Sequence, residues 1–313
     1  MATATTAADF RETAMLSRIA ELVYWIGRFT ERAEGVSKMV SSYHYSATQL
    51  GSLETRSGLH DLIAAFGQHE EDEESTFRST ATWWVTASSN PTSVLSCIRG
   101  ARENARRARE VLSLEVWESL NGTAWALEAL VASGASYDIV ADRVPDYTRA
   151  LFGVVETTTP RDEAWEVFRL GTMLERAAMT LRAVLIGAEA VERLPDDDPL
   201  ALHAWTVTLR ACSALDAYRR TSVAVPRGPE VLALLLQSAT CPRSVLFALR
   251  EVQSVVPSGT KAFGVTSRAR KLLTTPLEHG DGEIPALADR LLGACDRIHA
   301  SVITGWRGGW ETP

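Results

Sequence analysis

The stretch from Met15 to Leu53 most constrains the fold, because it contains no proline and its apolar residues recur at the spacing of an amphipathic helix. The apolar positions are Leu16, Ile19, Val23, Ile26, Ala33, Val36, Val40 and Tyr43. A rotation of about 100° per residue places a second face opposite this stripe. That face carries Ser17, Glu21, Tyr24, Arg28, Glu31, Arg32 and Gly35. This mixture of small, aromatic and oppositely charged side chains indicates a surface that contacts protein or ligand rather than water.

The same pattern returns near the middle of the chain, where Phe168–Ala178 (FRLGTMLERAA) aligns with Tyr24–Glu34 (YWIGRFTERAE). The alignment pairs Gly27 with Gly171. It also pairs two Glu-Arg-Ala runs, Glu31-Arg32-Ala33 and Glu175-Arg176-Ala177. A second match follows in the same order, between NPTSVLSCIRG (Asn90–Gly100) and CPRSVLFALRE (Cys241–Glu251). Two independent matches in the same order predict a duplicated chain.

The composition of the chain excludes several classes of protein. Of 313 residues, 46% are hydrophobic and 23% are charged, as in a soluble globular protein. A net charge of −7 argues against generic nucleic-acid binding, which needs a basic surface. The longest strongly apolar run, Val231–Leu236, is too short to cross a bilayer. The N-terminal residues lack the basic and apolar regions of a signal peptide, and four widely separated cysteines without a CxxC pattern predict reduced core thiols. We therefore expect a cytoplasmic protein.

No stretch shows sustained alternation of apolar and polar residues, so the sequence predicts an all-α fold. Apart from the first helix, we expect helices at 59–68, 77–87, 93–119, 123–134, 145–155, 160–194, 200–218 and 230–238, one from residue 242, and two more that end near residue 304. Asn121-Gly122 is expected to be a turn or kink, and the acidic run Glu70–Glu74 a solvated loop. The predicted organisation is a flexible tail at residues 1–13 and one helical-bundle domain at 14–313. The domain would contain two divergent tandem repeats, over residues 15–158 and 160–304.

The predicted helix 93–119 carries a stripe of arginines at spacings of three and four, formed by Arg99, Arg102, Arg106 and Arg109. Like charges at this spacing oppose helix formation, so the stripe requires counter-ions. The candidates are Glu31 or Glu175 on a partner helix, an acidic patch on another protein, or the carboxylate or phosphate of a ligand. Arg210 and Tyr218, on the predicted helix 200–218, could extend the same arginines into a cleft for an anionic substrate.

The two Glu-Arg pairs allow two interpretations. Glu31 and Glu175 could be catalytic acids or bases beside electrophilic arginines, provided that burial or a neighbouring carboxylate raises their pKa. Alternatively, two equivalent helices cross at the centre of the fold, and the Glu of one pairs with the Arg of the other. Because adjacent residues project about 100° apart on a helix, Glu31 and Arg32 need different partners, which favours the cross-helix network. The six histidines show no metal-ligand spacing.

Segments spread along nearly the whole chain resemble the Alpha-E family, named for predicted all-α proteins with a Glu-Arg motif. The matching segments are MLSRIAELVYWIGRFTERAE, ARENARRAREVLSLEVWESLN, FRLGTMLERAAMTLR, WTVTLRACSALDAYRR and CPRSVLFAL. The family pattern leads us to expect an Arg before the second Glu-Arg pair, where this chain has Thr172. Any role that Arg28 would share with that position is therefore in question.

The resemblance implies a partner subunit of a circularly permuted ATP-grasp protein, often encoded near a transglutaminase-like protein. ATP and Mg²⁺ would then belong to the ATP-grasp partner, and this chain would bind an anionic or peptide substrate in an amide-bond-forming or peptide-modifying system. Candidate substrate-binding residues are Tyr24, Arg28, Arg32, Arg99, Arg102, Arg106, Arg176, Arg210 and Tyr218. The alternatives are a stand-alone amide- or carboxylate-processing enzyme that uses Glu31 and Glu175, and a purely scaffolding protein. A homo-oligomer is compatible with each of them.

Overall fold

A computed structural model describes residue 15 and the ranges 17–51, 76–192, 194–195, 198–222, 224–275 and 283–308. Over these residues the chain forms twelve α-helices and one short π-helical segment, and it contains no strand. The all-α prediction is therefore confirmed. The predicted helix 59–68, the acidic run 70–74 and the predicted tail lie outside the described residues.

The helices of the first half are α1 (Ser17–Leu50), α3 (Phe77–Thr86), α4 (Val94–Arg107), α5 (Leu114–Ala132) and α6 (Tyr137–Thr158). Those of the second half are α7 (Glu163–Val191), α8 (Pro199–Ala211), α9 (Leu215–Thr221), α10 (Gly228–Leu232), α11 (Val245–Val255), α12 (Lys261–Thr274) and α13 (Glu283–Gly308). The π-helical segment η1 (Ala233–Gln237) continues α10.

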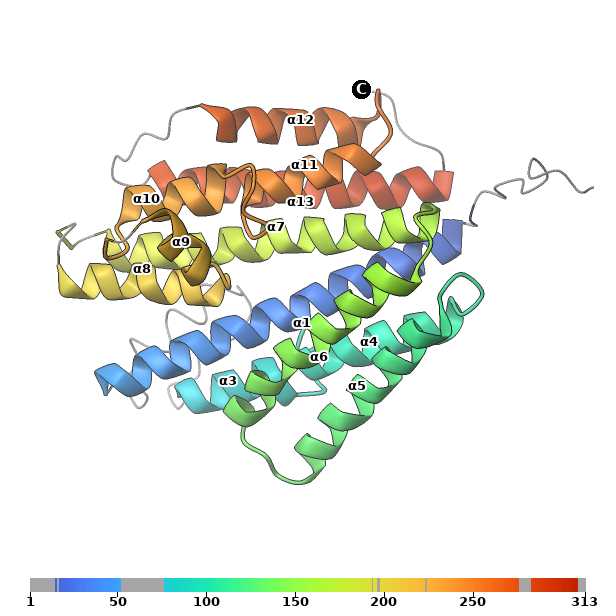
Figure 1. Cartoon of the computed structure of the whole chain (residues 1–313), viewed down its shortest axis with the longest axis horizontal. Coiled ribbons are helices and arrows are strands. Elements are labelled where there is room, and N and C mark those ends of the chain that lie inside the picture. The colour runs from blue at the N-terminus through green and yellow to red at the C-terminus, as the bar shows by residue number, and fades with distance from the viewer. Residues whose placement is uncertain are drawn as a thin grey trace, which may run out of the picture.

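Helices α1 and α7, the two that carry the Glu-Arg pairs, form the centre of the molecule. They pack along each other and bury residues on nearly every face. The remaining helices lie in layers on either side, with α3 to α6 next to α1 and α11 to α13 next to α7 (Figure 1). A helix that is covered all round needs partners for its charged residues as well as its apolar ones. The Glu-Arg pairs are therefore core residues.

The two halves repeat one order of packing. Helix α1 packs on α4 and α6, and α5 packs on both of these; in the same way α7 packs on α11 and α13, and α12 packs on both. The caps also correspond, because the hydroxyl of Ser93 accepts from the third amide of α4 and that of Ser244 from the third amide of α11. The duplication itself stays a prediction, but the equivalent segments occupy equivalent positions.

The predicted helix 93–119 is wrong, because the chain breaks after α4. Ala108 has left helical geometry, and the Ser113 hydroxyl accepts from the amide of Val116 to start α5. The predicted turn at Asn121-Gly122 is also wrong, since both residues lie within α5. The break lets α5 fold back against α4, which buries Val116 and Leu120.

Two further helix boundaries differ from the predictions. Pro145 lies inside α6 rather than at its start, because the two turns before it are held by buried Tyr137 and Val140 against the core. The predicted helix 200–218 is interrupted between α8 and α9 at Ser213, whose φ is 54°. A non-glycine residue in this left-handed region is unfavourable and requires support from its surroundings. The four cysteines are buried and free of disulfides, as predicted.

Candidate functional site

The α1–α7 crossing depends on a glycine in each helix. A Cβ atom at Gly27 would lie 2.3 Å from the carbonyl oxygen of Phe168, and a Cβ at Gly171 would lie 2.2 Å from that of Tyr24. In the alignment of the two repeats Gly27 matches Gly171 and Tyr24 matches Phe168, so the contacts are reciprocal. The two backbones approach too closely here for any side chain. This close approach also brings together the Glu-Arg pairs that come four residues after each glycine.

Glu175 of α7 is fully buried and binds two arginines of α1. Arg28 donates through Nε to Glu175 Oε2, and Arg32 donates to both carboxylate oxygens, at 2.6 Å from Nε and 3.0 Å from Nη2. Arg28 also donates to the hydroxyl of Tyr24 at 2.9 Å. The fork of Arg32 matches the planar carboxylate, an arrangement that gives strong, directional pairing.

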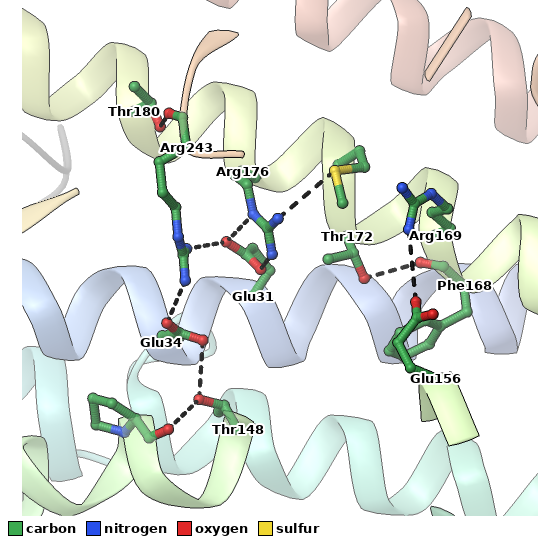
Figure 2. A network of polar contacts seen from close by, with 12 residues as sticks. Glu31, Glu34, Thr148, Glu156, Phe168, Arg169, Thr172, Arg176, Thr180 and Arg243 are labelled. Atoms are coloured by element: carbon green, nitrogen blue, oxygen red, sulfur yellow. Dashed lines mark hydrogen bonds and ion pairs between the residues drawn. The ribbon is translucent and has the colours of Figure 1, made fainter. Parts of the chain in front are cut away.

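Glu31 of α1 makes the complementary pair with α7. Arg176 donates to its two oxygens at 2.9 and 2.7 Å, and Arg243, from the segment before α11, donates to Oε1 at 2.9 Å (Figure 2). Arg243 also binds Glu34 at 2.6 Å, and Glu34 accepts from the Thr148 hydroxyl at 3.0 Å. The predicted cross-helix pairing of the two Glu-Arg motifs is therefore present in both directions.

The arginines keep both central carboxylates ionised. Burial by itself raises the pKa of Glu175, but Arg28 and Arg32 outweigh it and hold that pKa well below its usual range. Burial likewise raises the pKa of Glu31, and Arg176 and Arg243 bring it below the ordinary value. A general base that works near neutral pH needs a pKa near that pH and free access to a proton. Neither carboxylate meets this condition.

Arg243 supplies the second positive charge for Glu31, which Thr172 cannot supply. Thr172 is the residue equivalent to Arg28, and its hydroxyl only donates to the carbonyl of Phe168 at 3.0 Å. Glu31 thus receives its second arginine from outside α7, whereas Glu175 receives both of its arginines from α1. Each central carboxylate nevertheless has two cationic partners.

The Glu175 end of the network continues to α13. The Tyr24 hydroxyl lies 2.9 Å from Nδ1 of His299, and the two rings stack with their centroids 5.7 Å apart. Burial and the nearby Arg28 lower the pKa of His299 to about 4. This histidine is therefore neutral at physiological pH.

A separate cavity of about 440 Å³ opens between α1, α6 and the α8–α9 junction. Its charged lining residues are Lys38, Arg149, Arg210, Asp142, Asp146 and Asp216, and its hydroxyl-bearing residues are Ser41, Ser42, Tyr45 and Ser213. The volume lies within the range of small-molecule sites, about 300 to 1,000 Å³. We call this feature the α1–α6 cavity.

The two Glu-Arg pairs of the central helices also identify the family of the chain. A family model described as "a predicted alpha-helical domain with a conserved ER motif" matches residues 15–300. The chain belongs to the Alpha-E family. The match spans both halves, and the central ion pairs of this Alpha-E domain are made by two Glu-Arg pairs, one in each half.

Relatives of this Alpha-E chain occur in mycobacteria. An uncharacterized protein of Mycobacterium bovis and two of Mycobacterium tuberculosis are each 26% identical to it over 322 residues, which covers 91% of this chain and 35% of the relative. The chain therefore spans about a third of the length of the curated relatives it matches. No solved structure shows a significant match.

The structure separates the arginines that the sequence suggested might form one cleft. On α4, Arg99 pairs with Glu128 of α5 at 2.7 Å, Arg102 binds Asn121 at 2.7 Å, and Arg106 pairs with Glu103 at 2.7 Å. Of the candidate counter-ions, Glu31 and Glu175 are therefore not the ones that they bind: α5 supplies Glu128 and Asn121, and α4 itself supplies Glu103. Arg109, the last of the stripe, lies over the ring of Trp117 at 5.1 Å.

The other two cleft candidates lie on α8 and α9. Arg210 lines the α1–α6 cavity, and Tyr218 is buried with its hydroxyl directed at the carbonyl of Val225, 3.4 Å away. Helix α8 packs on α1 and α7, whereas α4 packs on α1 and α5. The common cleft of Arg99, Arg102, Arg106, Arg210 and Tyr218 is therefore not formed.

Sequence analysis missed Arg243, Glu34 and Lys38. A signal for two of them exists on α1, where polar residues recur at spacings of three and four from the Glu-Arg pair into the cavity. These residues are Glu31, Glu34, Lys38, Ser41 and Tyr45. Arg243 has no comparable local signal, because it precedes the cap of α11 and reaches Glu31 only through the tertiary fold.

None of the helices in the described ranges combines the length and the apolar composition needed to cross a membrane.

Proposed function

We propose that this domain is a helical partner of an ATP-grasp protein in a cytoplasmic amide-bond-forming or peptide-modifying system. The domain would bind an anionic or peptide substrate, while the partner would bind ATP and Mg²⁺. One observation carries the proposal: the only carboxylates that the two Glu-Arg motifs supply are buried in ion pairs and held ionised. The motif residues therefore build the core, and neither motif glutamate is free to act as an acid or a base.

Two further observations support an accessory role. The relatives are about three times as long as the region they share with this chain, so in those proteins the shared region is one part of a larger chain. The α1–α6 cavity gives the domain a place to hold a small substrate, which a purely scaffolding protein does not need. A stand-alone enzyme that uses Glu31 or Glu175 is disfavoured, because each carboxylate already has two arginine partners.

Copurification and ATP consumption test the proposal together. The chain is co-expressed with the circularly permuted ATP-grasp protein, and with the transglutaminase-like protein, of the same genome, and it alone carries an affinity tag. We expect the ATP-grasp protein to copurify and the complex to consume ATP faster than the ATP-grasp protein alone when peptide is present. ATP hydrolysis by the isolated chain, or an unchanged rate in the complex, would refute the accessory role.

A further inference from the structure

The α1–α6 cavity contains three cations that have no protein partner. Over the described residues, the side chains of Lys38, Arg149 and Arg210 make no ion pair or hydrogen bond. Lys38 is half-buried, whereas Arg149 and Arg210 are exposed. The arginines at the α1–α7 crossing, Arg28, Arg32, Arg176 and Arg243, all bind carboxylates. Cations that lie close together without a direct ion pair repel one another and are suited to an anionic ligand.

Lys38 is the most enclosed of the three. It is half-buried on α1, one turn beyond Glu34, and desolvation together with the nearby Arg149 lowers its pKa. Glu34 and Asp142 attract it, but neither forms an ion pair with it, because Glu34 is bound to Arg243 and Thr148 and Asp142 accepts from Ser41 and Tyr45. An anion in the cavity would supply the charge that Lys38 lacks.

The cavity also contains a carboxylate without a partner. Asp142 accepts from the hydroxyls of Ser41 and Tyr45, each at 2.7 Å, and Asp216 lies 3.6 Å from Arg219. Asp146 has no hydrogen bond or ion pair to any residue that the structure describes. Free charges of both signs therefore line one cavity, and carboxylates at this position would repel a polyphosphate such as ATP.

Ser213 adds a strained and unpartnered hydroxyl. It is the one non-glycine residue with positive φ among the described residues, and its Oγ is buried with no hydrogen-bond partner there. Its positive φ belongs to the turn that ends α8, because the Ser213 amide donates to the carbonyl of Arg210 at 2.9 Å and the Ala214 amide donates to that of Leu209 at 2.8 Å. The hydroxyl has no such explanation, and a buried hydroxyl without a partner is costly unless a ligand or water binds it. Ser213 lines the same cavity as the free charges.

We propose that the α1–α6 cavity binds a small zwitterionic ligand, an amino acid or a short peptide. Its carboxylate lies against Lys38, Arg149 and Arg210, and its ammonium group against Asp146. The Ser213 hydroxyl completes the hydrogen bonds of the carboxylate end. This inference deepens the proposed function by placing its peptide substrate, and it concerns the chain alone.

Ligand-observed NMR titration of the full chain tests the site. The probes are trialanine, N-acetyl-trialanine and trialanine amide, which carry both charges, only the negative one and only the positive one. Removing one charged hydrogen-bonding group from a ligand weakens binding by about tenfold or more. We expect wild-type protein to bind trialanine and to bind each capped peptide at least about tenfold more weakly.

Two cavity variants test which end of the peptide each side chain binds. Lys38→Met should lose most of the discrimination against the amide, and Asp146→Asn should lose most of the discrimination against the acetylated peptide. Arg106→Gln, which alters an exposed arginine outside the cavity, should bind like the wild type. Circular dichroism and the Tm of each variant show whether it is folded.

Three results would overturn the inference: no binding of trialanine to the folded wild type, equal affinity for the capped peptides, or unchanged discrimination in both cavity variants. Failure of this test leaves the ATP-grasp partnership to be judged by copurification. Binding of trialanine by a chain that recruits no ATP-grasp protein would refute only the partnership.

Discussion

Replacing Glu175 with glutamine tests whether the central ion pairs hold the fold together. The substitution keeps the shape of the side chain but removes the charge that neutralises Arg28 and Arg32. The Glu175 side chain is fully buried, and Arg28 is only 10% exposed. Removing one partner of a buried ion pair costs on the order of 3 to 5 kcal/mol, because the remaining charge stays desolvated.

This loss is a large fraction of the stability of a typical protein, which is about 5 to 15 kcal/mol. A chain of 313 residues has an unfolding entropy of roughly 0.7 kcal/mol/K. The expected decrease in Tm of Glu175→Gln is therefore about 5 to 8 °C. Differential scanning calorimetry measures it, and urea unfolding measures the free energy of unfolding independently.

Glu128→Gln is the matched control. Glu128 also pairs with an arginine, Arg99, at 2.7 Å, but both side chains are exposed. Exposed pairs contribute about 0 to 1 kcal/mol, so the control should lower the Tm by less than about 2 °C. A Glu175→Gln variant that unfolds at the same temperature as Glu128→Gln would refute the idea that buried charge pairing holds α1 on α7.

The pH dependence gives a second measure of the same interaction. The pKa of Glu175 in the folded protein lies well below the value in the unfolded chain, which is about 4.3. Its stabilising contribution is therefore complete above that pH and is lost as the pH falls toward the folded-state pKa. Between about pH 5 and about pH 3, the wild type should lose more stability than Glu175→Gln.

Four further substitutions have defined outcomes. Gly171→Ala forces a Cβ against the Tyr24 carbonyl and should lower the free energy of unfolding by more than about 2 kcal/mol, whereas Gly122→Ala, with open space in α5, should raise it by about 0.5 to 1 kcal/mol. Burial lowers the pKa of His299 to about 4, so the stability that the neutral histidine contributes is complete above about pH 6.5 and is lost as the pH falls to about 4. The free energy of unfolding of His299→Gln, measured in urea, should therefore depend less on pH in this window. Ser213→Gly removes a left-handed serine whose buried hydroxyl has no partner among the described residues, so it should raise the Tm of the ligand-free protein, and an unchanged or lower Tm would show that the strain is absent.

The sequence by itself determined the helical class, the two central helices and the need for cross-helix pairing. Helical periodicity is a local property, and adjacent Glu and Arg side chains point about 100° apart, so each had to find a partner elsewhere. A glycine inside a helix costs about 1 kcal/mol relative to alanine, so its presence at equivalent positions 27 and 171 is itself a signal of tight helix contact, which the backbone contacts explain.

Only the tertiary structure decided which charges meet. Arg99 and Arg102 of α4 bind residues of α5 because α5 starts at the Ser113 cap and folds back against α4. A cap of this kind competes with helix continuation by small energies that contacts elsewhere can outweigh. Arg243 reaches Glu31 from a distant segment, and the α1–α6 cavity forms from three separate elements. Such contacts depend on how helices pack in space, and helical periodicity constrains only which face of each helix is apolar.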